Sequence, residues 1–354
     1  MKKILIITPR FYPSIWWIEE QVKILWENFK EKWYSIDILT NKYNNNLKNK
    51  EILFWLNIYR FSNFLNYIFF LIKNNNYDLI ISRQYYKNSF ILWVLKFFKI
   101  IKSKTIICAD SWWENDEINN IKNKLNFLFI YKIYFFFIWK NNYLNCLNIE
   151  NNIHLYNIYK WKKYIKKFTN IYNWINIKLS KNKKILEIKN ILFLWRFEIE
   201  KWIFETIEAF NLLKDNNITL NLVWYWDKNI ENKIKEKIKN NKNIIFHWKL
   251  YWNEKEEIIK NTDLFVFPSY YPEWQPVTIT EITLNNIPII TTDVGNNKEI
   301  YWNNLLYVNK QDIKNLKEKI DWVISNIKNY EYNYSDALEK IDISNITNQF
   351  LKLK

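Results

Sequence analysis

The stretch Asp263-Leu-Phe-Val-Phe-Pro-Ser269 is followed by Glu273-Trp-Gln-Pro-Val-Thr-Ile-Thr-Glu281 and then by Pro288-Ile-Ile-Thr-Thr-Asp-Val-Gly295. The first and third segments are apolar runs, which are typical of strands buried in a parallel sheet. Pro276 favours the start of a helix between them, so Glu273 falls in the loop and Glu281 lies two turns into the helix. The unpaired N–H groups at a helix N-terminus attract anions, so these residues predict an anion-binding loop flanked by two carboxylates.

The same alternation of strand and helix extends along the chain. Apolar runs predict further strands at residues 2–8, 34–40, 77–82, 104–109, 190–194, 219–223 and 244–246. Helical periodicity predicts helices over residues 18–32, 203–213, 230–240 and 277–284. Strands that alternate with helices predict parallel sheets covered by helices.

The length of 354 residues suits two domains rather than one. We expect an N-terminal domain over residues 1–172, a second domain over residues 173–335, and a C-terminal helix over residues 336–354 that packs back toward the first domain. No apolar run reaches the roughly 18 residues of a membrane span, and the start of the chain does not resemble a signal peptide. Cys108 and Cys146 lack metal-site or disulfide spacing, so we expect a cytoplasmic protein without a zinc site.

Glycine is nearly absent and tryptophan is abundant. The chain has 1 Gly and 20 Trp, whereas average usage would give roughly 25 Gly. Sheets of this kind need glycine where the backbone has positive φ or approaches another group closely. Trp33, for example, follows a predicted helix at the C′ position, which favours glycine. Two explanations remain open: a UGA codon that means glycine in the source was translated as tryptophan, or the chain is natively rich in tryptophan.

The charge is concentrated in the first half of the chain. Residues 1–172 contain 26 Lys and Arg against 12 Asp and Glu, while residues 173–354 contain 26 against 24. A basic half predicts an anionic partner. Aromatic-rich stretches at residues 64–72 and 127–139 favour an anionic membrane surface over nucleic acid. General solubilising charge is the alternative.

Two further loops carry groups suited to a phosphate. The segment Leu194-Trp-Arg196-Phe-Glu-Ile-Glu-Lys201-Trp202 places two cations in one βα loop. There they can clamp a diphosphate and neutralise the charge of a phosphate leaving group. The segment Ser14-Ile-Trp16-Trp17-Ile18-Glu19 enters the first helix. With glycine at positions 16 and 17 its backbone can approach phosphate or sugar, whereas two indoles prevent that approach.

These motifs resemble those of the GT-B glycosyltransferases, specifically the large retaining family 4, over nearly the whole chain. That family has a Gly-Gly loop, a Gly-Arg-x4-Lys-Gly loop, and a Glu-Gly pair that ends seven residues before a second Glu. The matching residues are Trp16-Trp17, Trp195-Arg196 with Lys201-Trp202, and Glu273-Trp274 with Glu281. Every departure at a family glycine is a tryptophan, which favours recoding. The resemblance implies an α/β protein of GT-B fold, with two Rossmann-like domains whose parallel sheets face across a cleft.

The resemblance also implies roles for individual residues. Arg196 and Lys201 hold the donor diphosphate, Glu281 contacts the ribose hydroxyls, and Glu273 lies against the transferred sugar. The family often has a His near that sugar, and Asp110 is the candidate here for the polar role. The remaining donor contacts are expected from the backbone of the two loops, at Trp16, Trp17, Trp274, Gln275, Pro276 and Val277.

We therefore expect a retaining hexosyltransferase that moves a sugar from a nucleotide-diphosphate sugar to a glycan or lipid-linked acceptor in cell-surface polysaccharide synthesis. The departing phosphate assists deprotonation of the acceptor, so no protein nucleophile, metal or cofactor is expected. Localisation is expected to be cytoplasmic, with peripheral attachment to the inner membrane face as an option, and no nucleic-acid partner. The alternatives are a GT-B sugar-nucleotide epimerase and a non-catalytic scaffold that binds anions or membranes.

Overall fold

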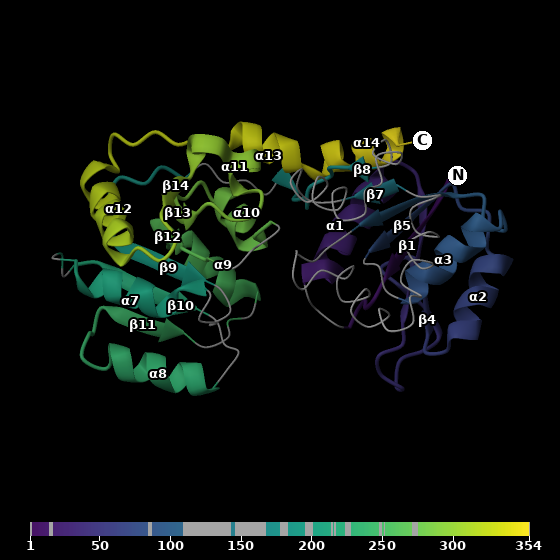
Figure 1. Cartoon of the computed structure of the whole chain (residues 1–354), viewed down its shortest axis with the longest axis horizontal. Helices are drawn as coiled ribbons and strands as arrows, with labels where there is room; N and C mark the ends of the chain where they lie inside the picture. The colour runs from purple at the N-terminus through teal and green to yellow at the C-terminus, as the bar shows by residue number, and fades with distance from the viewer. Residues whose placement is uncertain are drawn as a thin grey trace, which may run out of the picture. The chain divides into compact units, whose positions relative to one another are not determined.

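The computed structural model divides the chain into two compact units, each built around one sheet (Figure 1). Unit 1 comprises residues 1–175 and 341–354, and unit 2 comprises residues 176–340. The structure describes residues 2–13, 17–83, 87–108, 143–145, 168–177, 183–194, 201–213, 215, 217–223, 228–247, 250, 252–270 and 275–353.

The described sheet of unit 1 has the strand order β3-β4-β2-β1-β5-β6-β7-β8. The predicted strand at the N-terminus is its centre, because it pairs in parallel with β2 on one side and β5 on the other. Ile4, Leu5 and Ile6 are fully buried there, as expected of a strand covered on both faces. The strands are β1 (Lys3–Thr8), β2 (Ser35–Asn41), β3 (Lys50–Leu53), β4 (Leu56–Phe61), β5 (Leu79–Arg83), β6 (Lys104–Cys108), β7 (Tyr143–Asn145) and β8 (Phe168–Thr169).

Helices cover both faces of this sheet. Helix α1 (Trp17–Glu31) connects β1 to β2, while α2 (Phe64–Lys73) and α3 (Lys87–Phe97) make connections in the opposite direction, to β5 and β6. Right-handed crossovers therefore place α1 on one face and the α2–α3 pair on the other, as Figure 1 shows.

The C-terminal end of the chain belongs to unit 1. Helix α14 (Ile343–Lys352) packs against α1, and its apolar residues Ile343, Ile346 and Phe350 enter the core of unit 1. Full burial of one such side chain stabilises a protein by about 1.5–3 kcal/mol. The side chains of Asn28 and Thr347 add a buried hydrogen bond of 2.7 Å between the two helices. The apolar face of α14 and this hydrogen bond therefore both hold it on α1.

A β-hairpin interrupts the otherwise parallel sheet, which the sequence pattern did not predict. Strands β3 and β4 are antiparallel, with Leu53 opposite Leu56. The loop between them consists of Phe54 and Trp55, which have φ of 53° and 66°. Two positive φ values in a two-residue loop define a type I′ turn, which strongly prefers Asn-Gly, Asp-Gly or Gly-Gly. Trp55 therefore occupies a glycine position.

The described sheet of unit 2 has the order β11-β10-β9-β12-β13-β14, with all its pairs parallel. Most of these strands lie within one or two residues of their predicted positions. The strands are β9 (Asn190–Leu194), β10 (Thr219–Val223), β11 (Ile244–His247), β12 (Leu264–Phe267), β13 (Ile289–Thr292) and β14 (Leu306–Val308).

The connections of unit 2 reverse direction at β9 and β12, which are neighbours. From β9 the chain runs through β10 to β11, and from β12 it runs through β13 to β14. Such a switch point opens a crevice at the carboxyl ends of the strands, where open α/β sheets bind ligands. The helices are α7 (Ile203–Asn211), α8 (Lys228–Ile238), α9 (Trp252–Lys260), α10 (Val277–Thr283), α11 (Asn297–Tyr301), α12 (Ile313–Asn326) and α13 (Ser335–Ile341), with a 3₁₀ turn, η5 (Trp302–Asn304).

Four tryptophans have the backbone conformation of glycine. Ten Trp lie among the described residues, and φ is positive at Trp33, Trp55, Trp202 and Trp302, whereas only a few per cent of non-glycine residues have positive φ. Trp302 combines φ of 47° with ψ of −124°, outside the regions open to a residue with a Cβ. Gly295 also has positive φ, at 61°.

Trp33 shows why the chain needs this geometry. The amide N–H of Trp33 donates to Lys30 O at 2.9 Å, and that of Tyr34 donates to Phe29 O at 3.1 Å. These two bonds form the Schellman motif that ends α1, and its C′ residue must be left-handed. Lys99 ends α3 in the same way with φ of 61°, so a side chain is tolerated at such a position at some cost in stability.

Trp174, in contrast, has the surroundings of an ordinary buried tryptophan. Its indole N–H donates to Gln21 O at 2.7 Å, and the guanidinium of Arg83 lies 5.0 Å from its ring centroid. The side chain is buried in the core of unit 1. These contacts favour a native tryptophan at position 174, where φ is not positive.

Candidate functional site

Polar residues gather at the carboxyl edge of the sheet in unit 2, next to the switch point. Lys201 follows β9, Gln275 follows β12, and Asn296 follows β13. All three side chains are buried. Because neighbouring parallel strands end at the same edge, the sequence order of these loops places them around the crevice where ligands bind in such sheets.

Lys201 is held at the start of α7. Its side chain is fully buried, which is rare for a lysine. The next residue, Trp202, is the N-cap of α7 in the left-handed conformation, with φ of 63° and ψ of 36°. The carbonyl of Trp202 accepts hydrogen bonds from the Thr206 amide at 3.0 Å and the Thr206 hydroxyl at 2.7 Å. The left-handed residue therefore turns the chain sharply between the Lys201 ammonium and the helix.

Hydrogen bonds join the loops that follow β12 and β13. The hydroxyl of Thr292 donates to the carbonyl of Ser269, and both residues are fully buried. The Asn296 side-chain amide donates to Gln275 Oε1 at 3.4 Å. These contacts fix the position of Gln275, one of the predicted donor-binding residues.

Asn297 presents a buried acceptor at the same edge. Its side-chain amide donates to Thr292 O at 3.4 Å, but its Oδ1 has no hydrogen-bond partner among the described residues. A buried oxygen without a partner is uncommon in proteins and requires a donor from water or a ligand. Asn297 therefore adds a polar atom that a bound hydroxyl or amine can satisfy.

Glu281 lies in the second turn of α10 and pairs with Lys255 of α9. The distance from Lys255 Nζ to Glu281 Oε2 is 2.6 Å, and the two side chains are 28% and 36% exposed. A carboxylate offers about four acceptor sites. One ion pair therefore leaves Glu281 able to accept hydrogen bonds from sugar hydroxyls.

The start of α10 differs slightly from the prediction. Pro276 is the N-cap, with φ of −64°, and Val277 is the first helical residue. Proline has no amide hydrogen, so the expectation of a backbone N–H contact from Pro276 is wrong. Its fixed φ positions the Gln275 and Val277 amides instead.

Several predicted site residues lie outside the described residues. These are Trp16, Asp110, Arg196, Glu273 and Trp274. Of Trp17, the first residue of α1, only the backbone is described. The structure therefore places Lys201, Gln275, Pro276, Val277 and Glu281 in unit 2, in the loops after β9 and β12 and on α10.

Sequence reasoning missed Thr292, Asn296, Asn297 and Lys255. A signal for three of them was present, because Thr292 ends a predicted strand, and Asn296 and Asn297 lie in the polar segment that comes after it. Lys255 gave no such signal, because its contact with α10 depends on how the helices pack.

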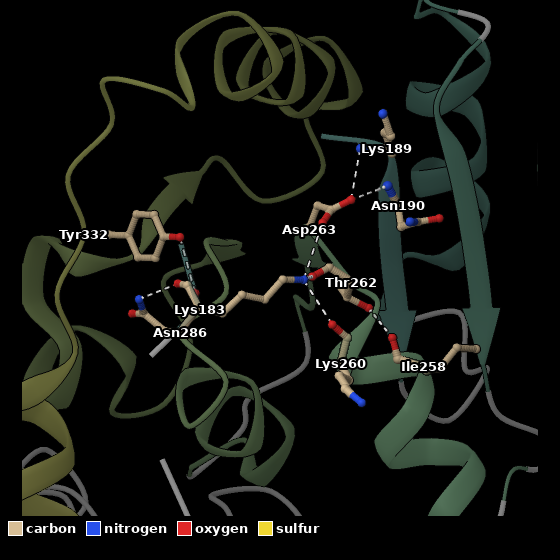
Figure 2. Close-up of polar contacts among 9 residues, drawn as sticks. All are labelled: Lys183, Lys189, Asn190, Ile258, Lys260, Thr262, Asp263, Asn286 and Tyr332. Carbon is tan, nitrogen blue, oxygen red and sulfur yellow. Dashed lines mark hydrogen bonds and ion pairs between the residues drawn. The ribbon is translucent and has the colours of Figure 1, made fainter. Parts of the chain in front are cut away.

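A second polar cluster, at the opposite edge of the same sheet, is structural (Figure 2). Lys183 Nζ donates to Lys260 O at 3.0 Å, to Thr262 O at 2.6 Å and to Asp263 Oδ1 at 3.4 Å. An ammonium has three donors, so these acceptors satisfy it. Asp263 Oδ2 accepts from the amides of Lys189 and Asn190 at 3.1 and 2.9 Å. The cluster therefore ties the starts of β9 and β12 together, and the Lys183 ammonium has no donor left for a ligand.

The described residues lack two further features. They contain no group of three His, Cys, Asp or Glu residues placed to hold a metal ion. None of their helices combines the length and the apolar character that crossing a membrane requires. The apolar stretch at residues 125–139 lies outside the described residues.

Unit 2, which carries this edge, is similar in sequence to a known protein family. Residues 176–338, which cover nearly all of unit 2, match the sequence model of a family described as Glycosyl transferases group 1. The carboxyl edge with Lys201, Gln275 and Glu281 lies inside this match. No curated protein matches the chain.

Solved structures resemble the chain over its whole length. HepE from Anabaena, in complex with UDP and glucose, has a TM-score of 0.73 at 13% identity, covering 100% of this chain and 99% of that chain. Sucrose-phosphate synthase from Thermosynechococcus elongatus has a TM-score of 0.73 at 15% identity, covering 100% and 98%. A glycosyltransferase from Rickettsia africae has a TM-score of 0.71 at 17% identity, covering 99% and 97%. The predicted fold is therefore confirmed: the chain has two α/β domains of the GT-B type.

Proposed function

We propose that this chain is a retaining glycosyltransferase of family 4 that moves a hexose from a nucleotide-diphosphate sugar to a glycan or lipid-linked acceptor. The observation that carries the proposal is the glycosyltransferase match over residues 176–338, because that segment contains the carboxyl edge described above. HepE, which has the same fold, was crystallised with UDP and with UDP-glucose. This likeness supports a nucleotide sugar as the donor.

The proposed chemistry depends on charge neutralisation at the leaving group. Arg196 and Lys201 hold the diphosphate, and their positive charges stabilise the nucleoside diphosphate as it departs. Preorganised electrostatic groups of this kind contribute several kcal/mol to catalysis. The full burial of Lys201 supports this role, because a buried ammonium interacts with an anion more strongly than one in water does.

The remaining residues orient the donor. Glu281 accepts hydrogen bonds from the ribose hydroxyls, and Glu273 and Asp110 lie near the transferred sugar. Backbone amides at Gln275 and Val277 contact sugar and phosphate. The departing phosphate accepts the acceptor proton on the same face, which retains the anomeric configuration without a protein nucleophile.

We assign acceptor binding to residues 1–172 and donor binding to residues 173–335, with residues 336–354 returning to the first domain. The basic first half suits a lipid-linked or membrane-borne acceptor. Cell-surface polysaccharide synthesis at the cytoplasmic face of a membrane is the proposed role.

We also propose that most of the tryptophans are glycine in the natural protein, encoded by UGA. Trp33, Trp55, Trp202 and Trp302 support this directly, because each has a backbone conformation that favours glycine. The sequence supports recoding in the donor-site loops as well, because glycosyltransferases of family 4 have glycine at the positions that match Trp16, Trp17, Trp195 and Trp274. Sequencing of the gene tests this: we expect UGA codons at Trp202 and Trp302, and UGG codons there would contradict recoding.

Nucleotide binding tests the proposed function. We call the chain with glycine at all 20 tryptophan positions the glycine-restored protein. UDP and UDP-glucose should raise its melting temperature, and Lys201→Ala should reduce that shift. A folded glycine-restored protein whose melting temperature no nucleotide or nucleotide sugar changes would contradict the proposal.

Product stereochemistry tests retention separately. With an α-linked nucleotide sugar as donor, a retaining enzyme gives an α-linked product, which NMR of the anomeric proton identifies. A β-linked product would preserve the glycosyltransferase assignment and refute retention.

A further inference from the structure

The outer face of α2 is apolar and exposed. The inner residues Tyr67, Phe70 and Leu71 pack into unit 1. The solvent-facing residues are also apolar, with Phe69 66% exposed, although the outer face of a soluble helix normally carries polar residues. The exposed apolar residues of α2 are Phe64, Leu65, Phe69 and Ile72. None of these four residues is a tryptophan, so the surface is the same whether the tryptophans of this chain are native or stand in place of glycine.

The apolar surface continues at the end of the neighbouring helix. Helix α3 packs against α2, and both helices run back toward the start of a strand in the same parallel sheet. Their C-terminal ends therefore lie at the same edge. Phe98 and Ile100, directly after α3, are exposed there, with Phe98 62% exposed.

Lysines surround this surface. Lys73 ends α2, and Lys99, Lys102 and Lys104 follow α3, and all four are exposed. Residues 64–105 contain seven Lys and Arg and one acidic residue, Asp78. Asp78 is itself occupied, because its Oδ2 accepts the Lys3 amide at 2.7 Å. We name this surface, formed by the outer face of α2 and residues 98–104, the α2–α3 surface.

We infer that the α2–α3 surface docks unit 1 onto an anionic lipid bilayer. Apolar side chains enter the boundary between headgroups and acyl chains, and the lysines lie among anionic headgroups. A second copy of this chain fits less well, because two lysine rims of equal charge would meet. Nucleic acid offers phosphates to the lysines but nothing to exposed Leu65, Phe69 and Ile72. The inference locates the membrane partner of the proposed function, and its test uses no sugar donor.

Vesicle binding tests the surface. The full-length glycine-restored protein is the right form, because exposed indoles at Trp33, Trp55 and Trp302 would themselves insert into membranes. Sedimentation with vesicles of phosphatidylcholine and phosphatidylglycerol is compared with sedimentation with phosphatidylcholine alone. We expect binding to the anionic vesicles, weakening as salt rises.

Two variants separate the apolar and the charged contributions. Leu65→Ser with Phe69→Ser and Ile72→Ser should lower the partition coefficient at least tenfold. Replacing Lys99, Lys102 and Lys104 by Gln should lower it by about fivefold per lysine and flatten its salt dependence. Ile52→Ser is the matched control, because Ile52 is 67% exposed on the β3–β4 hairpin of the same unit, and binding should not change.

Three results would overturn the inference. One is equal binding to neutral and anionic vesicles, and another is unchanged binding by the serine variant. The third is a dimer in size-exclusion chromatography that the serine variant converts to monomer, which would assign the surface to a second copy. Nucleotide-induced stabilisation, measured on the same samples, shows whether the donor site remains intact in each case.

Discussion

The ammonium of Lys255 lies 2.6 Å from Glu281 Oε2, so an ion pair joins α9 to α10 beside the carboxyl edge of unit 2. The pair limits the rotation of the Glu281 side chain. The carboxylate is thereby held in a restricted orientation, which favours hydrogen bonds to the hydroxyls of a ribose. We propose that Glu281 contacts the donor and that Lys255 positions its carboxylate.

Replacement of these two residues should weaken UDP binding to different extents. Glu281→Gln removes a charged acceptor, whose hydrogen bonds contribute about 1.5–3 kcal/mol, so affinity should fall at least tenfold. Lys255→Met removes only a partly exposed ion pair and should cost about fivefold at most. Calorimetric titration measures both. Lys317→Met, which removes the comparable Lys317–Asp321 pair on α12, should leave affinity unchanged, and an unaffected Glu281→Gln variant would contradict the ribose assignment.

Two lysines at opposite edges of the sheet in unit 2 should affect different properties, one the kinetics and the other the stability. Lys201→Ala, like Arg196→Ala, should lower kcat/KM by about 2–4 kcal/mol in transition-state free energy. Lys183→Ala removes the hub of the cluster in Figure 2 and should lower the free energy of unfolding by about 1–3 kcal/mol. The folded fraction of the Lys183 variant should keep normal kinetics. A kinetic defect without loss of stability in that variant would show that the site is misplaced.

Retaining single tryptophans in the glycine-restored protein tests the backbone argument. Tryptophan at position 302 should lower the free energy of unfolding by about 1–3 kcal/mol, because its φ and ψ are forbidden to most residues with a side chain. Tryptophan at position 322 should raise it by about 0.5–1 kcal/mol, because glycine is unfavourable inside the helix α12. Thermal melts compare the two directly. Equal shifts in the same direction would remove the conformational argument for recoding.

His247 should make the free energy of unfolding decrease as the pH is lowered. This half-buried residue of β11 lies 2.9 Å from Asn221 Oδ1 through its Nε2, and burial lowers its pKa below the ordinary 6.5. A lowered pKa means that the unfolded chain takes up the proton first. The contribution is therefore fully present above the unfolded pKa and is lost as the pH falls through the folded pKa. Between about pH 7.5 and about pH 5.5, the melting temperature of the glycine-restored protein should fall more steeply than that of its His247→Asn variant. Parallel plots of melting temperature against pH would refute this.

The sequence predicted the elements with strong periodicity and missed those that depend on turns or packing. Strands such as Asn190–Leu194 and Thr219–Val223 are buried apolar runs, and the structure places them at those residues. The β3–β4 hairpin was not predicted because its turn has the sequence Phe54-Trp55, whereas the usual signal for such a turn is Asn-Gly or Gly-Gly. A loop with glycine at position 55 would have marked it.

The candidate site was predictable in part for the same reason. Lys201 and Glu281 were found from linear motifs within single βα units. The contact of Asn296 with Gln275 could not be predicted, because it forms between loops that follow two different strands, and the linear sequence does not show that β12 and β13 are neighbours.

Transfer from a nucleotide sugar is the measurement that tests the central claim most directly. The glycine-restored protein is incubated with a panel of nucleotide-diphosphate sugars, and release of nucleoside diphosphate is followed with and without lipid-linked acceptors. We predict that one sugar nucleotide is consumed and that acceptor accelerates its consumption. Arg196→Ala and Lys201→Ala should slow consumption as a loss of about 2–4 kcal/mol in transition-state stabilisation implies. A folded protein that neither binds nor consumes any member of the panel would contradict the account.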